Sequence, residues 1–339
     1  MPARQTRRRF LQQMFGLGAA ALPWPQAAGA RESAIPRRRL GRTNEMVSML
    51  GLGGWHMGSI NDDRQAIGLV REAVDLGVTF MDNAWGYHQG RSEELMGRAL
   101  TGGRRQKVFL MTKHHGRDKK TSMRHLEDSL RRLGTDVIDL WQFHEVIYRD
   151  DPDRILGPNG GIEAAELAKQ QGKVRFIGFT GHKDPAVFLR MLSNDYPWDA
   201  VQMPVNVLDA HFRSFQQRIL PLLIKRDIGA IAMKSLASGH LLRTGTVTPA
   251  EALTYTWSQP VTTLVSGMPS SRILHTNARL AAHFRPLSRE EQGRLLARTE
   301  KIARTGEYEP FKTTTGFDSS VGRRQHGNEI IRLKPRAPL

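Results

Sequence analysis

Residues 78–87 read Val-Thr-Phe-Met-Asp-Asn-Ala-Trp-Gly-Tyr, a short apolar run that ends in Asp82 and is followed closely by Tyr87. Apolar and β-branched residues in such a short run predict a buried strand. Two similar runs follow, and they end beside Lys113 and His144. The spacing from Asp82 to Lys113 and from Lys113 to His144 is 31 residues each. This even spacing predicts a repeated strand–helix unit.

The same alternation extends through most of the chain. Between the strands lie segments with apolar residues at helical spacing, such as Met123, Leu126 and Leu130. Eight strands that are each followed by a helix predict an α/β fold, a (β/α)8 TIM barrel formed as a single domain by residues 31–305. The strands are expected at Ser48–Gly53, Val78–Asp82, Lys107–Thr112, Val137–Phe143, Val174–Phe179, Ala200–Val205, Gly229–Met233 and Thr262–Ser266.

Two segments flank the predicted barrel. Residues Pro36–Asn44 are expected to form a small hairpin or plug. Residues 306–339 are rich in Gly, Thr, Arg and Pro and show no periodicity, so we expect a loosely ordered tail.

The first 30 residues have the layout of an export signal. An Arg-Arg-Phe-Leu run at residues 8–11 precedes a short apolar region at 14–23, and small residues follow at 28–30. This run is similar to a twin-arginine signal, which predicts a signal peptide at residues 1–30, recognition by the Tat export machinery, and a periplasmic or secreted protein. The apolar region is too short for a stable membrane anchor. The alternative is a basic arm and a core helix, which its glycines and proline would weaken.

The composition narrows the function classes. The 339 residues are 39% apolar, which suffices for a sizeable core. The chain has no cysteine, which suits an oxidising compartment and excludes thiolate-held iron–sulfur centres. The net charge of +17 is also found in nucleic-acid-binding proteins, but here the basic residues are scattered and no aromatic–basic pattern accompanies them. We therefore expect no nucleic-acid partner and a solvated basic surface with a phosphate-bearing cofactor.

Polar residues gather at the predicted strand ends, where barrels of this kind carry their chemistry. Burying so many of them unpaired would cost about 1–3 kcal/mol each, so as a group they favour a functional site. Singly, each has a simpler explanation: a capping Asp82, a surface-packed Tyr87, a solvated Lys113 or a core His144. The candidates are Asp82, Tyr87, Lys113, His144, Thr180, His182, Gln202, Asn206, Lys234, Ser266, Gly267 and Ser270.

Several stretches resemble the aldo-keto reductase family. Lys113 falls between the second and third of them, and Asn277 stands ten residues after Gly267. The resemblance covers roughly residues 37–282 and implies an NADP-dependent oxidoreductase barrel, with NAD as the alternative cofactor. The stretches are residues 80–87, 90–100, 138–144, 172–178, 229–234 and 266–268.

The resemblance also implies roles for single residues. Tyr87 is expected to be the general acid that protonates a carbonyl oxygen while the nicotinamide donates hydride. Lys113, held in place by Asp82, is expected to lower the pKa of this phenol by up to about three units. His144 is expected to orient the substrate oxygen or to relay its proton.

Cofactor contacts follow from the same resemblance. Gln202, helped by Thr180, is expected to hold the nicotinamide carboxamide. The start of the last barrel helix suits phosphate, because its backbone N–H groups are free to bind an anion. The expected contacts in this region are Lys234, Ser266, Gly267, Ser270, Arg272 and Asn277.

Some positions depart from the common family pattern. Residues 180–182 read Thr-Gly-His where Ser-Asn is frequent, Met233 stands where an aromatic residue often stacks, and Pro269 stands where a basic residue is frequent. These departures leave NAD open as an alternative to NADP. Four histidines lack the spacing of a zinc centre, so we expect no metal. They are His56, His88, His114 and His115.

Three functions remain at this point. The first is an enzyme that transfers hydride between a nicotinamide cofactor and a small carbonyl or alcohol substrate. The second is a nicotinamide-binding redox-sensing module with little turnover. The third, a barrel hydrolase, finds no carboxylate pair or metal set at the strand ends to support it.

Overall fold

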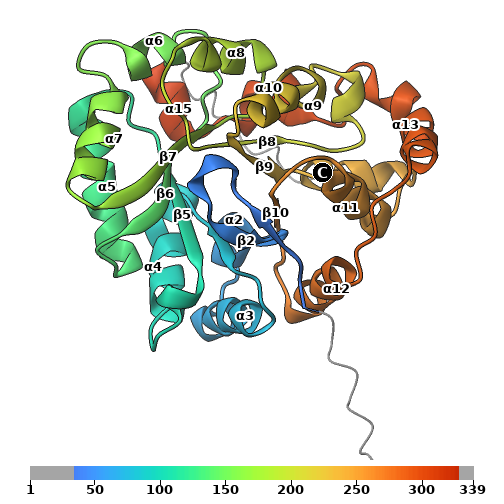
Figure 1. Ribbon diagram of the computed structural model, residues 1–339, viewed down its shortest axis with the longest axis horizontal. Coiled ribbons are helices and arrows are strands. Elements are labelled where there is room, and N and C mark those ends of the chain that lie inside the picture. Colours follow the sequence, from blue (N-terminus) through green and yellow to red (C-terminus); the bar gives the residue numbers. More distant parts are fainter. Residues whose placement is uncertain (1–33, 328–339) are drawn as a thin grey trace, which may run out of the picture. The chain divides into compact units, whose positions relative to one another are not determined.

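The computed structural model describes residues 34–327, and the predicted export signal lies outside them. Eight parallel strands close into a barrel in the order β10-β3-β4-β5-β6-β7-β8-β9, with helices around it (Figure 1). This confirms the predicted (β/α)8 TIM barrel. The strands are β3 (Leu50–Gly53), β4 (Phe80–Asp82), β5 (Phe109–His114), β6 (Ile138–Phe143), β7 (Val174–Thr180), β8 (Ala200–Pro204), β9 (Gly229–Met233) and β10 (Thr263–Ser266).

The surrounding helices bury one face each, as the apolar spacing predicts. In α5, Leu126, Leu130 and Leu133 face the core, Asp118 caps the first turn and Gly134 ends the helix in the left-handed conformation. The longer helices are α3 (Asp63–Asp75), α4 (Arg91–Ala99), α5 (Lys119–Leu133), α7 (Gly161–Gln170), α8 (Pro185–Ser193), α11 (Pro249–Ser258), α12 (Ser271–Ala282) and α13 (Arg289–Ala303). The shorter ones are α2 (Gly54–Gly58), α6 (Asp151–Leu156), α9 (Phe215–Arg218) and α10 (Leu220–Lys225).

The predicted N-terminal hairpin is present. Strands β1 (Arg37–Arg39) and β2 (Met46–Ser48) pair antiparallel, and the fully buried Leu40 between them packs on the barrel interior. Gly41 has a positive φ of 50°, and a Cβ atom there would lie 2.3 Å from the backbone nitrogen of Gly229. Only glycine lets the hairpin approach the barrel this closely.

The expectation of a loose tail from residue 306 is wrong for the part that the structure describes. Residues 306–327, which we call the C-terminal strap, contain α14 (Pro310–Thr313) and α15 (Ser320–Gln325). Phe311 and Lys312 are fully buried, and α15 lies beside α6, where Arg154 Nη1 donates to the backbone oxygen of Gln325 (Figure 1). Helices of one or two turns show no apolar periodicity, so the pattern could not reveal them.

One boundary shifts in a way that matters for the site. The third barrel strand runs to His114 rather than ending at Thr112, so Lys113 lies inside β5 instead of just after it. Within residues 34–327, no helix combines the length and the apolar character needed to span a membrane.

Candidate active site

Lys113 joins three of its neighbours at the carboxyl end of the barrel. Its Nζ lies 2.7 Å from Asp82 Oδ2 and 3.3 Å from the Tyr87 hydroxyl, and it donates to the backbone oxygen of Asn83 at 2.7 Å. The side chain points into the barrel and is only 2% exposed. Three acceptors around one amine fix its position, so Asp82, Tyr87 and Lys113 form one hydrogen-bonded group.

Tyr87 is positioned by an unusual turn. His88 and Gln89 directly after it have positive φ angles of 49° and 58°, and the imidazole Nε2 of His88 lies 2.8 Å from the backbone oxygen of Trp55. The Trp55 ring then meets the Tyr87 ring edge-on at 5.3 Å. Two strained residues in succession are costly and are often found at functional sites. The turn holds the phenol toward Lys113.

His144 completes the predicted group. Its ring lies edge-on to Tyr87, with the ring centres 5.5 Å apart, and its backbone is fixed by Arg117 Nη2, which donates to the His144 carbonyl oxygen at 2.8 Å. Within residues 34–327 its buried Nδ1 has no hydrogen-bond partner. Burial, with His115 and Lys113 nearby, lowers the pKa of His144 well below its usual value. The imidazole is therefore neutral and can bond to a ligand.

The electrostatics of Tyr87 differ from the expectation. Burial and the carboxylates of Asp82 and Glu145 raise the pKa of the phenol well above its usual value. The Lys113 ammonium, 3.3 Å from the hydroxyl, favours the phenolate, but burial and the two carboxylates outweigh this effect. Burial also lowers the pKa of Lys113, against the pull of Asp82. Tyr87 is thus a protonated donor, not a readily ionised phenol.

Gln202 joins the same group from β8. Its Nε2 donates to Asp82 Oδ2 at 3.1 Å, while its buried Oε1 has no partner among the described residues. Thr180 is paired with it in register at the end of β7 and is also buried. A buried carbonyl oxygen without a donor is costly and fits a ligand that carries an N–H group. This is where the resemblance expects the nicotinamide carboxamide.

A second set of expected cofactor residues lies around the start of α12. Asn277 Nδ2 donates to Ser266 Oγ at 3.2 Å, and Ser270 caps the helix by accepting from the Ile273 backbone N–H. At Gly267, a Cβ atom would lie 2.2 Å from His56 Nδ1, so only glycine fits beside that ring. The predicted Arg272 is exposed on the first turn.

Lys234 is placed differently from this set. It follows β9 with a positive φ of 58°, and its Nζ lies over the rings of Phe311 and Phe317 in the C-terminal strap, at 4.9 and 5.8 Å from their centres. The predicted His182 also meets Phe311, edge-on at 5.9 Å. Both residues therefore face the strap.

Glu145 is a site residue that sequence reasoning missed. It follows His144 with a positive φ of 51°, is largely buried, and accepts the backbone N–H of Ser319 in the strap at 3.1 Å. His115 Nδ1 lies 3.8 Å away. Burial raises the pKa of the Glu145 carboxyl. No local pattern could identify it, because its partner is 174 residues away in the chain.

Several hydrogen bonds attach the C-terminal strap to the loops at the strand ends. Asp318 accepts from Lys183 Nζ at 2.6 Å and from the Tyr148 hydroxyl at 3.0 Å, and Gln325 Nε2 donates to the His115 backbone oxygen at 2.7 Å. It thus borders the group around Tyr87. Among the described residues, no cluster of three or more His, Asp or Glu side chains is arranged to hold a metal ion.

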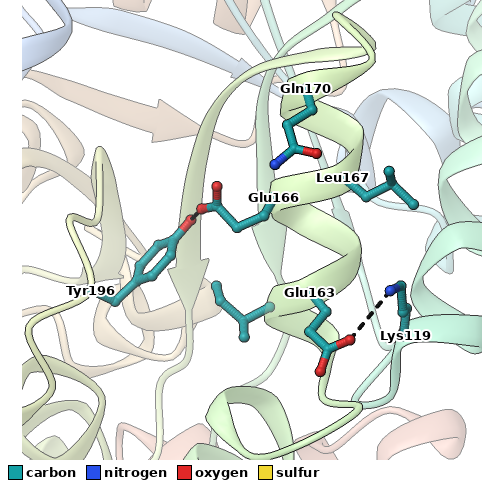
Figure 2. Close-up of a pocket in the computed structure, with 7 residues that line it drawn as sticks. Lys119, Glu163, Glu166, Leu167, Gln170 and Tyr196 are labelled. Atoms are coloured by element: carbon teal, nitrogen blue, oxygen red, sulfur yellow. Dashed lines mark hydrogen bonds and ion pairs between the residues drawn. The ribbon is translucent and has the colours of Figure 1, made fainter.

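A surface hollow on the outer side of α7 contains none of these residues. In Figure 2, Lys119 pairs with Glu163 at 3.3 Å and the Tyr196 hydroxyl bonds to Glu166, so its polar groups largely satisfy one another. The strand ends remain the candidate active site.

Comparisons with known proteins identify the family of the chain. The sequence model described as "Aldo/keto reductase family" matches residues 49–259. The chain is 30% identical over 233 residues to the uncharacterized oxidoreductase YrpG of Bacillus subtilis, a match over 60% of this chain and 67% of that protein. It is also 30% identical over 212 residues to the aldo-keto reductase YhdN of the same organism, over 58% of this chain and 60% of that protein.

Two solved structures are similar to the fold. The aldo-keto reductase AKR11C1 of Bacillus halodurans, in its holo form, matches with a TM-score of 0.67 and 27% identity over 78% of this chain and 96% of that one. An aldo-keto reductase of Klebsiella pneumoniae in complex with NADPH matches with a TM-score of 0.65 and 23% identity over 80% of this chain and 96% of that one. At 23% identity, the second likeness shows the fold alone.

Proposed function

Because the chain belongs to the aldo/keto reductase family, a family of NAD(P)H-dependent oxidoreductases, we propose that it transfers hydride between NADP and a small carbonyl or alcohol substrate, with Tyr87 as the proton donor. The observation that carries this proposal is the contact between Lys113 Nζ and the Tyr87 hydroxyl at 3.3 Å, inside a group that also holds Asp82.

The proposed proton step follows from the raised pKa of Tyr87. When bound, the nicotinamide supplies hydride to the carbonyl carbon. Tyr87 donates its proton to the carbonyl oxygen as negative charge develops there. The Lys113 ammonium then stabilises the phenolate that remains, and Asp82 keeps the ammonium in place. The neutral His144 ring orients the substrate oxygen beside the phenol.

The chain's own residues fit the cofactor. Gln202 Oε1 is a buried acceptor without a donor, so it suits the carboxamide N–H group, with Thr180 beside it. We propose that Ser266, Gly267, Ser270, Arg272 and Asn277 bind the phosphates, because they surround the start of α12. The aldo-keto reductase of Klebsiella pneumoniae with a similar fold was solved in complex with NADPH, and we propose NADP as the cofactor of this chain too.

Replacing Tyr87 with Phe tests the proposal. We expect kcat for carbonyl reduction to fall about 10²- to 10⁴-fold, because the proton donor is lost. The Kd for NADPH, measured by fluorescence titration, should stay unchanged. Tyr255→Phe is the matched control, since that buried hydroxyl bonds to Gln216 away from the site. Unchanged turnover in Tyr87→Phe would contradict the proposal, and NADPH binding without turnover in the wild-type protein would favour the sensing module.

We also propose export by the twin-arginine pathway to the periplasm or outside the cell. The support is the Arg-Arg-Phe-Leu run at residues 8–11, ahead of a short apolar region. Changing both arginines of the run to lysine should retain the protein in the cytoplasm, as cell fractionation would show. Equal distribution of the wild-type and variant proteins would rule the signal out.

A further inference from the structure

Four lysines lie at the strand ends or in the C-terminal strap, and three of them have carboxylate partners. Lys113 pairs with Asp82 at 2.7 Å. Lys183 pairs with Asp318 at 2.6 Å, and Lys312 pairs with both Asp209 and Glu309, at 2.7 and 2.8 Å. Buried ammonium groups are expected to be paired in this way, because removing an unpaired charge from water is costly.

Lys234 is the exception. Its Nζ has no hydrogen-bond acceptor and no ion-pair partner among residues 34–327, although the side chain lies against the strap. The aromatic faces of Phe311 and Phe317 hold the amine by cation–π contact. Rings attract a cation but do not accept its N–H bonds as an oxygen does. The side chain is only partly buried, so the amine is held beside the rings with its N–H groups open to water or to a ligand.

We propose that Lys234 binds an anionic group of the substrate, so that the enzyme acts on carbonyl compounds that carry a carboxylate. This inference rests on the proposed reductase function and names its substrate class. The two phenyl rings beside the amine would pack against the apolar part of such a substrate, while the amine pairs with its carboxylate.

The contacts of Lys234 favour the substrate over the phosphates of the cofactor. Its side chain touches the strap, which also meets Glu145 through the Ser319 N–H and His182 through Phe311. Glu145 directly follows His144 in the chain, and His182 lies two residues after the end of β7. The expected phosphate residues begin on the neighbouring strand, where Met233 pairs in register with Val265, so the contacts of the side chain with the strap are what favour the substrate.

The charges around Lys234 leave room for an anion. Glu145 favours the charged form of the Lys234 amine, and Lys113 opposes it. His56 and His182 also lie near the amine, and burial lowers the pKa of both imidazoles. Burial raises the pKa of the Glu145 carboxyl, which weakens its role as a counterion. Burial also lowers the pKa of Lys234 to about 8, so most of the amine is charged at neutral pH.

The test compares matched substrates in matched variants. The substrates are succinic semialdehyde and its methyl ester, which have the same chain but differ in charge. We expect the wild-type protein to prefer the acid in kcat/KM by at least roughly tenfold, since a charge-assisted bond contributes about that much. Lys234→Met should abolish this preference through KM, and Lys234→Arg should keep it. Lys119→Met is the control, because that exposed lysine pairs with Glu163 beside α7, away from the strand ends.

Each other result has a defined meaning. If Lys234→Met keeps the preference for the acid but raises the Kd for NADPH, the lysine binds the cofactor and the proposal is overturned. An equal kcat/KM for acid and ester in the wild-type protein overturns it as well. If Lys234→Met does not fold by circular dichroism, Lys234→Gln replaces it in the same comparison. Failure of the wild-type protein to reduce either aldehyde, or a panel of neutral ones, would instead reject the reductase function itself.

Discussion

The ammonium nitrogen of Lys113 lies 3.3 Å from the hydroxyl oxygen of Tyr87. Asp82 is closer to the same ammonium, at 2.7 Å, and burial together with the carboxylates of Asp82 and Glu145 keeps the pKa of the phenol raised. The pair therefore does not ionise Tyr87 in advance. It is arranged to stabilise the phenolate after the proton has left, which is when catalysis benefits from the charge.

The first prediction concerns the pH dependence of reduction. Burial and nearby carboxylates raise the pKa of Tyr87 well above 10, so the proton-donating form persists as the pH rises and is lost only above that value. We expect kcat for reduction to show no decline from Tyr87 between about pH 6 and about pH 9. Steady-state kinetics with saturating NADPH and a neutral aldehyde would measure this. A basic limb with a midpoint near neutrality would instead mean that Lys113 lowers the phenol's pKa.

The second prediction separates stability from catalysis at the Asp82–Lys113 pair. Lys113→Met leaves a buried carboxylate without its cation, so the free energy of unfolding should fall by about 3–5 kcal/mol. Asp82→Asn leaves the opposite charge unpaired and should also destabilise the protein. The double variant should regain much of the stability, because no lone charge remains. Its kcat should stay at least about a hundredfold below the wild-type value.

Urea unfolding and aldehyde reduction would be measured on all four proteins of this cycle. Additive losses of stability would show that the two groups do not interact. Recovery of kcat in the double variant would show that the ammonium has no part in the reaction.

Features that depend on local sequence could be predicted. The strand runs and helical spacing indicate the barrel, and placing chemistry at strand ends brings Asp82, Tyr87, Lys113 and His144 together before any coordinates. The turn after Tyr87 could not be predicted, because its two positive φ angles fall on His88 and Gln89 rather than on glycines.

Features that depend on distant partners could not be predicted. Lys312 is paired with Asp209, 103 residues earlier, and nothing near either residue indicates the contact. The pKa of Tyr87 depends in the same way on burial and on Glu145, whose position is set by the strap. The direction of this pKa shift depends on distances between groups in the folded chain, which sequence spacing cannot resolve.

The third prediction concerns the attachment of the C-terminal strap. Lys312 Nζ lies between Asp209 Oδ1 and Glu309 Oε2, and all three side chains are almost fully buried. Lys312→Met would leave two carboxylates buried without a cation, which should cost about 3–5 kcal/mol and release the strap before the barrel unfolds. Limited proteolysis should then cut near residues 306–327 while the barrel stays intact.

Lys183→Met should have a smaller effect, because the Lys183–Asp318 pair is partly solvated on the lysine side and the Tyr148 hydroxyl still bonds to Asp318. Equal cleavage rates in wild-type and Lys312→Met protein would show that other anchors hold the strap and that this buried charge cluster does not.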